Sequence, residues 1–134
     1  MPYNSYNYTF SHAPIRQIKM VGTHFERKLS NWLDSSYIPV NTETGEKLAR
    51  PGMILAIDSD TNKYVPYNSG ASYGTGSDTA VAVLDTLEDV TLGDVGIAPI
   101  YSGQLIESFC YILGGEEGTV SAGVKTALDE IEWV

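Results

Sequence analysis

The feature that most constrains the fold is how often turn-forming residues interrupt the chain. Thirteen Gly and six Pro are spread over 134 residues, and the apolar runs between them are short. Glycine and proline weaken helix interiors, and short apolar runs bounded by turn residues are typical of strands. The sequence therefore predicts a mainly β fold, and its length fits one domain.

The clearest strand is the apolar run of residues 53–57, which follows the turn Arg50-Pro51-Gly52. After a polar turn over residues 58–62, the chain returns as residues 63–67. Pro66 places this return at a sheet edge or a strand end, because proline has no N–H to give to a sheet ladder. Further strands are predicted over residues 79–87, 95–100 and 104–112.

Helical spacing begins earlier in the chain, with steps of three and four through Ile15, Ile18, Val21, Phe25, Leu29 and Trp32. Gly22 argues against one continuous helix from Ile15, and residues 15–21 are alternatively extended. Thr23 and Glu26 match a capping box, so a short helix is predicted over residues 24–33. Packing against the rest of the protein is the first interpretation of this stripe. A ligand for a partner's groove is the alternative, and the sequence leaves both open.

A second helical stripe lies near the end of the chain. Val120, Val124, Leu128 and Ile131 recur at spacings of three and four. This pattern predicts a short C-terminal helix. We expect the helix to lie across the open side of a small β-barrel or folded sheet.

Aromatic and polar residues alternate near the start of the chain, in Tyr6-Asn7-Tyr8-Thr9-Phe10-Ser11. A period of two with aromatic side chains indicates an extended strand with one apolar face. One hypothesis pairs this strand within its own domain. The other is an extended N-terminal arm that adds to a partner's sheet, with its aromatic rings in the partner's pockets.

Charge divides the chain into two parts. Residues 1–50 carry six basic and four acidic side chains, whereas residues 51–134 carry two basic and thirteen acidic ones. The net charge of −9 argues against nucleic acid and against anionic membrane surfaces as partners, because both require a basic face. We therefore expect an arm and short helix over residues 1–49 and a β-rich body over 50–134.

The compartment is inferred from cysteine usage and from targeting signals. The single cysteine, Cys110, rules out an internal disulfide bond, and no apolar run approaches the length of a membrane span. The first residues lack the basic and apolar regions of a secretory signal. We expect synthesis in a cytoplasm.

Residues for nucleophilic catalysis are not found together. Cys110 sits in an apolar run, where a free thiol usually packs as a small hydrophobic group. The two histidines, His12 and His24, both lie in the front part of the chain and have no evident partner. A Cys–His pair is therefore not expected, and the sequence predicts a protein that is not an enzyme.

Metal and phosphate motifs also fail to match. Residues 58–62 begin like a calcium loop, but Lys63 and Ser69 stand where an EF-hand needs Gly and Glu. The segment is interpreted as an Asx-rich hairpin turn. Gly74-Thr75-Gly76 lacks a third glycine and a following helix, so it is no phosphate loop. Zinc-ligand spacing is missing as well, and no cofactor or metal is predicted.

The order of the central motifs resembles the lambda-type phage head-decoration family. The resemblance begins with residues 50–57, a polar turn and the return Lys63-Tyr64-Val65-Pro66-Tyr67, and it covers about residues 50–134. An Ala/Val-rich strand over 80–84, an acidic turn, the Ser102-Gly103 turn and a C-terminal helix with Ala127-Leu128 follow in the family's order. Asn62 stands where the family often has Gly.

The resemblance implies a non-enzymatic capsid cement protein without a cofactor. Members form homotrimers on three-fold and quasi-three-fold sites of the expanded icosahedral head, bind the major capsid protein and resist the pressure of packaged DNA. Location on the outer capsid surface of the virion follows from this role.

Within this resemblance, residues 1–49 are assigned to contact with the capsid or a neighbouring subunit. The residues assigned to capsid contact by the arm are Tyr3, Tyr6, Tyr8, Phe10, Ile15, Arg16 and Lys19. The family-motif structural residues are Pro51, Gly52, Lys63, Tyr64 and Pro66.

Two alternatives remain at this point. One is another virion interaction module, such as a head fibre base or a tail component, and its assembly state would distinguish it from a trimeric decoration protein. The other is a small ligand-binding barrel or hydrolase that uses residues 68–78 as a lid. The second alternative requires a concave polar pocket near Cys110 or near the paired acidic residues.

Overall fold

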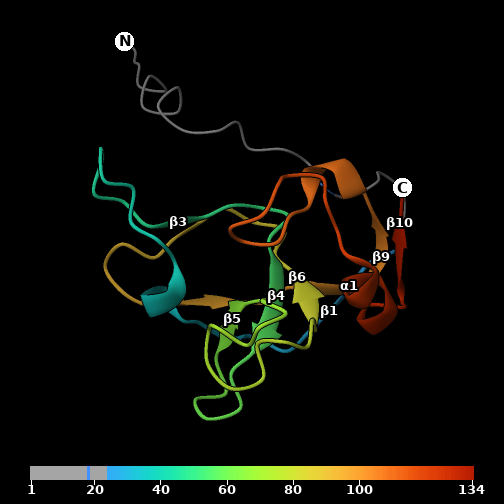
Figure 1. The fold of residues 1–134 in the computed structure, drawn as a ribbon, viewed down its shortest axis with the longest axis horizontal. Coiled ribbons are helices and arrows are strands. Elements are labelled where there is room, and N and C mark those ends of the chain that lie inside the picture. Colours follow the sequence, from blue (N-terminus) through green and yellow to red (C-terminus); the bar gives the residue numbers. More distant parts are fainter. Residues whose placement is uncertain (1–17, 19–23) are drawn as a thin grey trace.

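The computed structural model describes Ile18 and residues 24–134. It confirms a mainly β fold with one short helix near the C-terminus (Figure 1). Within the described residues, no helix is both long enough and apolar enough to cross a membrane. The elements are β1 (Glu26–Arg27), β2 (Asn31–Leu33), η2 (Ser35–Tyr37), β3 (Leu48–Ala49), β4 (Ile54–Ile57), β5 (Tyr64–Pro66), β6 (Ala82–Val83), β7 (Glu88–Asp89), β8 (Val95–Ile97), β9 (Ile100–Leu105), η3 (Glu107–Phe109), α1 (Ala122–Ala127) and β10 (Ile131–Trp133).

The main sheet is curled and follows the order β1-β9-β6-β4-β5-β2-β8. Most neighbours are antiparallel, but β2 runs parallel to β5, and β10 runs parallel to β9. Only the two residues Ala98 and Pro99 separate β8 from β9, so the last strand of the order joins directly to one near its start. The sheet therefore curls part of the way round, as a half-barrel. A separate two-stranded sheet is formed by β3 and β7.

The centre of the sheet is the predicted hairpin of β4 and β5. Leu55 lies opposite Pro66 and Ile57 opposite Tyr64 in an antiparallel register. Pro66 is the last residue of β5, which confirms its predicted place at a strand end. The continuous apolar sequence of β4 follows from its position, because both of its faces are buried.

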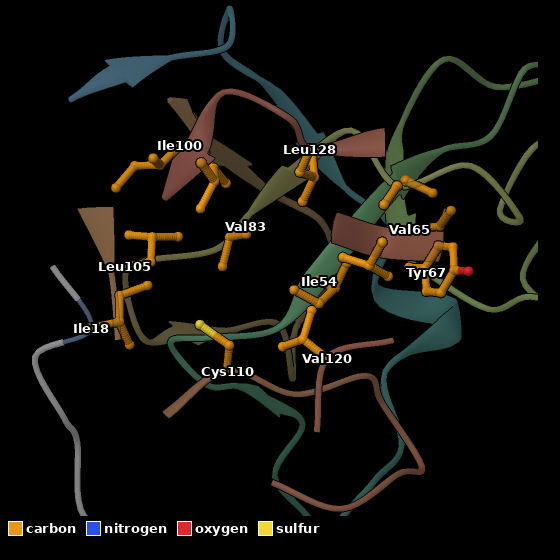
Figure 2. Close-up of a cluster of buried hydrophobic side chains, with 14 residues drawn as sticks. Ile18, Ile54, Val65, Tyr67, Val83, Ile100, Leu105, Cys110, Val120 and Leu128 are labelled. Atoms are coloured by element: carbon orange, nitrogen blue, oxygen red, sulfur yellow. The ribbon is translucent and has the colours of Figure 1, made fainter. Parts of the chain in front are cut away.

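Two apolar clusters lie on the two faces of this hairpin, because side chains alternate along a strand. Ile54 and Val65 belong to the first cluster, which includes Val124 and Leu128 from the helix region (Figure 2). Leu55 and Tyr64 belong to the second cluster. The first cluster confirms the expectation that the C-terminal helix covers one side of the sheet.

The front part of the chain contributes to the same sheet and core. β1 pairs with β9, and β2 pairs with both β5 and β8. Ile18 is 1% exposed, and its carbonyl accepts a hydrogen bond from Ile106 N at 2.7 Å. In Figure 2 it points into the first cluster beside Leu105 and Cys110. The assignment of residues 1–49 to capsid or neighbour contact stays a prediction.

The prediction of a helix over residues 24–33 is wrong. The structure has β1 and β2 there, joined by residues 28–30. Leu29 is 90% exposed and Trp32 is 54% exposed, so the stripe does not form one packing face. Asn31 and Leu33 instead pair with β8, and this long-range ladder outweighs the local helical spacing.

The strands expected over residues 79–87, 95–100 and 104–112 are present in part. Only Ala82 and Val83 form a strand in the first segment. The second segment divides between β8 and the start of β9. In the third, β9 ends at Leu105 and the chain turns through η3, where Cys110 N donates to Glu107 O at 2.9 Å. These segments are apolar because they are largely buried, and burial alone does not distinguish a strand from a turn.

The C-terminal helix is shorter than the apolar stripe that predicted it. α1 has six residues, with Ser121 as its N-cap and Leu128 at its C-terminal end. Ile131, the last member of the stripe, belongs instead to β10, where it lies opposite Gly103 of β9. The apolar periodicity therefore continues through a change from helix to strand.

Candidate interaction surface

The seven residues predicted for capsid contact lie outside the described residues. Their assignment rests on the sequence alone, and the structure shows only where the described chain begins. Ile18 fixes that point at the end of β9, next to η3. The residues concerned are Tyr3, Tyr6, Tyr8, Phe10, Ile15, Arg16 and Lys19.

Two of the motif residues, Pro51 and Gly52, form the turn that leads into β4. Gly52 has φ of +98°, and a Cβ there would stand 2.1 Å from Phe109 O. Its N–H donates to Leu84 O at 2.6 Å, and its carbonyl accepts from Tyr111 N at 2.9 Å. This glycine therefore joins three distant segments by close backbone approach, which a side chain at this position would prevent.

The other three motif residues, Lys63, Tyr64 and Pro66, lie at or within β5. Lys63 Nζ lies 2.7 Å from Asp94 Oδ2, and the pair is partly exposed. The hydrogen bond from Lys63 lowers the pKa of Asp94, and the N–H of Ser35 lowers it further. Tyr64 donates its hydroxyl to Leu29 O at 3.0 Å, and burial raises its pKa. These contacts tie β5 to the segments before β2 and β8.

Strand β1 is short and exposed, but hydrogen bonds of its two side chains hold it against neighbouring segments. Arg27 donates two hydrogen bonds to Asp85, at 2.7 and 2.6 Å, and a third to Ala98 O at 2.9 Å. The side chain of Asp85 is only 4% exposed, and its hydrogen bond raises the pKa of Arg27. Tyr101 adds a hydrogen bond to Glu26 at 2.8 Å. These contacts tie β1 to the segments that follow β6 and β8, and to β9.

The ring of Trp32 faces solvent on a strand whose next residue is buried. Trp32 alternates with Leu33, so its ring lies on the opposite face of β2. Its cross-strand partner is Gly96, where an added Cβ would meet only Ser30 Oγ, at 3.8 Å. We call Trp32 and the open position at Gly96 the Trp32 patch. Exposed tryptophan on a paired strand is a common anchor of protein interfaces.

A recess of about 280 Å³ lies beside the Trp32 patch, at the edge of β8. We call it the β8 recess. One wall is Gly96, Ile97 and Ala98, and the other comes from residues 84–88. Its lining includes the charged groups of Arg27, Asp85 and Glu88 and the hydroxyl of Thr86. The recess therefore lies between the edge of β8 and residues 84–88.

Cys110 and His24 do not form a Cys–His pair in the described part of the chain. Cys110 is fully buried, and burial, followed by the charge of Glu107, raises its pKa to about 12. Its thiol donates to Ile106 O at 3.5 Å. His24 is exposed and lies 3.7 Å from Glu26 Oε2, whereas His12 lies outside the described residues.

The acidic turn over residues 58–62 is a hairpin turn, as the sequence predicted. Asp58 accepts a hydrogen bond from Asp60 N at 3.0 Å, and Asn62 adopts a positive φ of 60°. This is the Asx-turn arrangement. Among residue 18 and residues 24–134, no group of three or more His, Cys, Asp or Glu side chains is placed to hold a metal ion.

Sequence reasoning missed three features of this surface. The exposure of Trp32, the open position at Gly96 and the edge of β8 all depend on pairing between β2 and β8, which are more than sixty residues apart. The sequence offered one signal, Gly96 within the predicted strand over residues 95–100, because a glycine inside a strand pattern marks an irregular position.

Searches of protein-family models, curated proteins and solved structures gave no match to this chain.

Proposed function

We propose that the chain is a phage capsid decoration protein, a non-enzymatic cement subunit that binds the outer surface of the expanded head. It acts as a homotrimer at three-fold and quasi-three-fold sites, with the major capsid protein as partner. The observation that carries the proposal is the Trp32 patch, an exposed aromatic anchor on a strand whose opposite face is packed into the core. The order of motifs over residues 50–134 supports the particular class.

The N-terminal arm supplies most of the contact in this proposal. Tyr3, Tyr6, Tyr8 and Phe10 have the chemistry for strand addition to a capsid loop. Burying their rings at about 25 cal/mol per Å² of apolar area contributes several kcal/mol for each copy, and ordering the arm offsets part of this. Three arms on one trimer multiply the effect through their effective concentration.

The distribution of charge along the chain also favours contact through the N-terminal part. Basic side chains of the front part, such as Arg16 and Lys19, face acidic capsid surface, while the exposed acidic side chains of residues 51–134 face solvent and keep free trimers apart. A trimer placed in this way bridges neighbouring capsid subunits. The subunits then separate only if the trimer is stripped from the shell, which is how the protein resists internal pressure.

Two variants test the proposal with empty expanded heads of the parent phage. Removal of residues 1–14 is expected to leave a folded trimer that no longer co-sediments with heads. Trp32→Ser is expected to weaken binding at least about tenfold, since a buried aromatic anchor contributes more than about 1.4 kcal/mol. Val40→Ser is the matched control, because Val40 is also half exposed but lies outside the patch. Normal occupancy by the truncated protein would contradict the role of the arm.

A further inference from the structure

Strand β8 lies at one end of the strand order of the main sheet, among the described residues, and β1 lies at the other. It pairs with β2 on one side, and no described strand pairs with its other side. A free edge presents N–H and C=O groups that accept a further strand. The three residues of β8 offer about 10 Å of such an edge. The β8 recess lies directly beside it.

The two sides of this edge offer different contacts. The lining of the recess is more apolar than polar, but it includes the polar side chains of Thr86 and Glu88. The ring of Trp32 lies on the other side, next to the open position at Gly96. A strand added to β8 therefore meets an uncovered tryptophan with one of its faces and lies next to Thr86 and Glu88 with the other. Aromatic side chains across from an edge glycine are known to fill such positions.

Residues 6–11 of this chain have the pattern that the edge requires. In an extended strand, Tyr6, Tyr8 and Phe10 share one face, and the polar residues Asn7, Thr9 and Ser11 share the other. The aromatic face matches Gly96 and Trp32, and the other face brings the hydroxyl of Thr9 toward Thr86 and Glu88 in the recess. Residues 1–23 carry no acidic side chain, so they do not repel Asp85 and Glu88.

The length of the preceding chain allows the same molecule to supply this strand. Ile18 is anchored beyond the end of β9, while β8 joins the start of β9 through Ala98 and Pro99. The path from Ile18 to β8 is therefore about the length of β9, which is about 20 Å for a strand of this size. Seven residue steps separate Ser11 from Ile18, and an extended chain covers about 23 Å in that number of steps.

Attachment to the same molecule also favours a molecule's own arm over that of a second copy. A short flexible connection holds the arm near β8 at an effective concentration in the millimolar range. A separate copy outside the same trimer reaches that concentration only in very concentrated solution, and the intrachain or interchain character of the trapped product distinguishes the molecule's own arm from that of a trimer neighbour. The arm of the same molecule is therefore the first occupant to test.

We infer that residues 6–11 dock on the free edge of β8 of their own molecule, with Tyr8 beside Trp32 and with Thr9 facing the β8 recess. The docked arm covers aromatic rings that are otherwise exposed before the protein meets a partner. This docking does not depend on the proposed capsid function. If both hold, the head competes with β8 for the arm.

Disulfide trapping in the full-length chain tests the docking. Thr9→Cys is combined with Thr86→Cys, and the purified protein is oxidised and run on a non-reducing gel. Cys110 is buried with its pKa raised to about 12, so it does not compete for the new thiols. The matched control combines Thr9→Cys with Thr126→Cys, an exposed position on α1.

The expected result is an intrachain disulfide in most of the Thr9/Thr86 molecules and at least about fivefold less in the control pair. The trap is also expected to weaken when Tyr8→Ser is added, because the ring beside Trp32 is lost. Equal trapping in both pairs would overturn the inference. So would a dimer band in place of the intrachain product, since the arm would then belong to a second copy. Failure of the reduced, full-length protein to bind heads, with intrachain trapping as expected, would count only against the capsid function.

Discussion

At position 52 the backbone leaves no room for a side chain. Gly52→Ala places a Cβ 2.1 Å from Phe109 O at a positive φ, so we expect a loss of more than about 2 kcal/mol in the free energy of unfolding. Gly45→Ala is the matched control, because Gly45 also has a positive φ but an added Cβ meets nothing within 4 Å. Its expected cost is about 1 kcal/mol. Urea denaturation measures both, and equal losses would contradict the close approach at Gly52.

The ion pair of Lys63 and Asp94 gives a prediction for acid stability. The folded-state pKa of Asp94 is lowered, first by its hydrogen bond with Lys63. Its contribution to stability is therefore complete above the unfolded pKa and is lost as the pH falls through the folded pKa. Lys63→Met is expected to reduce the difference between the urea midpoints at about pH 6 and about pH 3. Asp94→Asn should have the same effect, and an additive double variant would contradict the pairing.

At the scale of elements, the sequence predicts well where the signal is local. The run over residues 53–57 and its return are strands because their apolar residues are bounded by Gly52, Pro66 and a polar turn. Residues 24–33 were predicted wrongly because Leu29 and Trp32 have helical spacing without being buried. The strands there depend on pairing with distant β8 and β9, which a local pattern does not contain.

The N-cap of α1 gives a prediction at the same scale. Ser121 Oγ accepts a hydrogen bond from Val124 N at 3.4 Å, and Val124 is fully buried in the first cluster. Ser121→Ala is expected to lower the free energy of unfolding by about 1 kcal/mol or slightly less, because the bond is long. Ser121→Asp keeps an acceptor at the cap and should restore most of the loss. Thermal denaturation of the three proteins measures the effect, and a neutral alanine variant would contradict the capping role.

For the whole molecule, Ile18 is the first described residue of the chain and belongs to the core. Its side chain is buried in the first cluster, so Ile18→Ala is expected to cost about 2–4 kcal/mol in the free energy of unfolding. Removal of residues 1–14 leaves this anchor in place and is expected to cost less than Ile18→Ala. Urea denaturation compares the two. A loss on truncation as large as that of Ile18→Ala, or no loss at Ile18→Ala, would contradict the role of Ile18 as the anchor.

The candidate site could be predicted only in part from the sequence. The alternating arm and the basic front part are local or compositional features, and from them the sequence predicts an interaction protein. The Trp32 patch and the β8 recess require the pairing of β2 with β8 and the approach of residues 84–88. These arrangements arise from the curling of the whole sheet, which no single segment specifies.

The central claim is that this chain is a trimeric capsid cement protein, and the most direct test is its mass in solution with and without expanded heads. Light scattering is predicted to give about 44 kDa, three times the 14.6 kDa chain, and the protein is predicted to co-sediment with empty expanded heads. A monomer that leaves the heads undecorated would contradict the account.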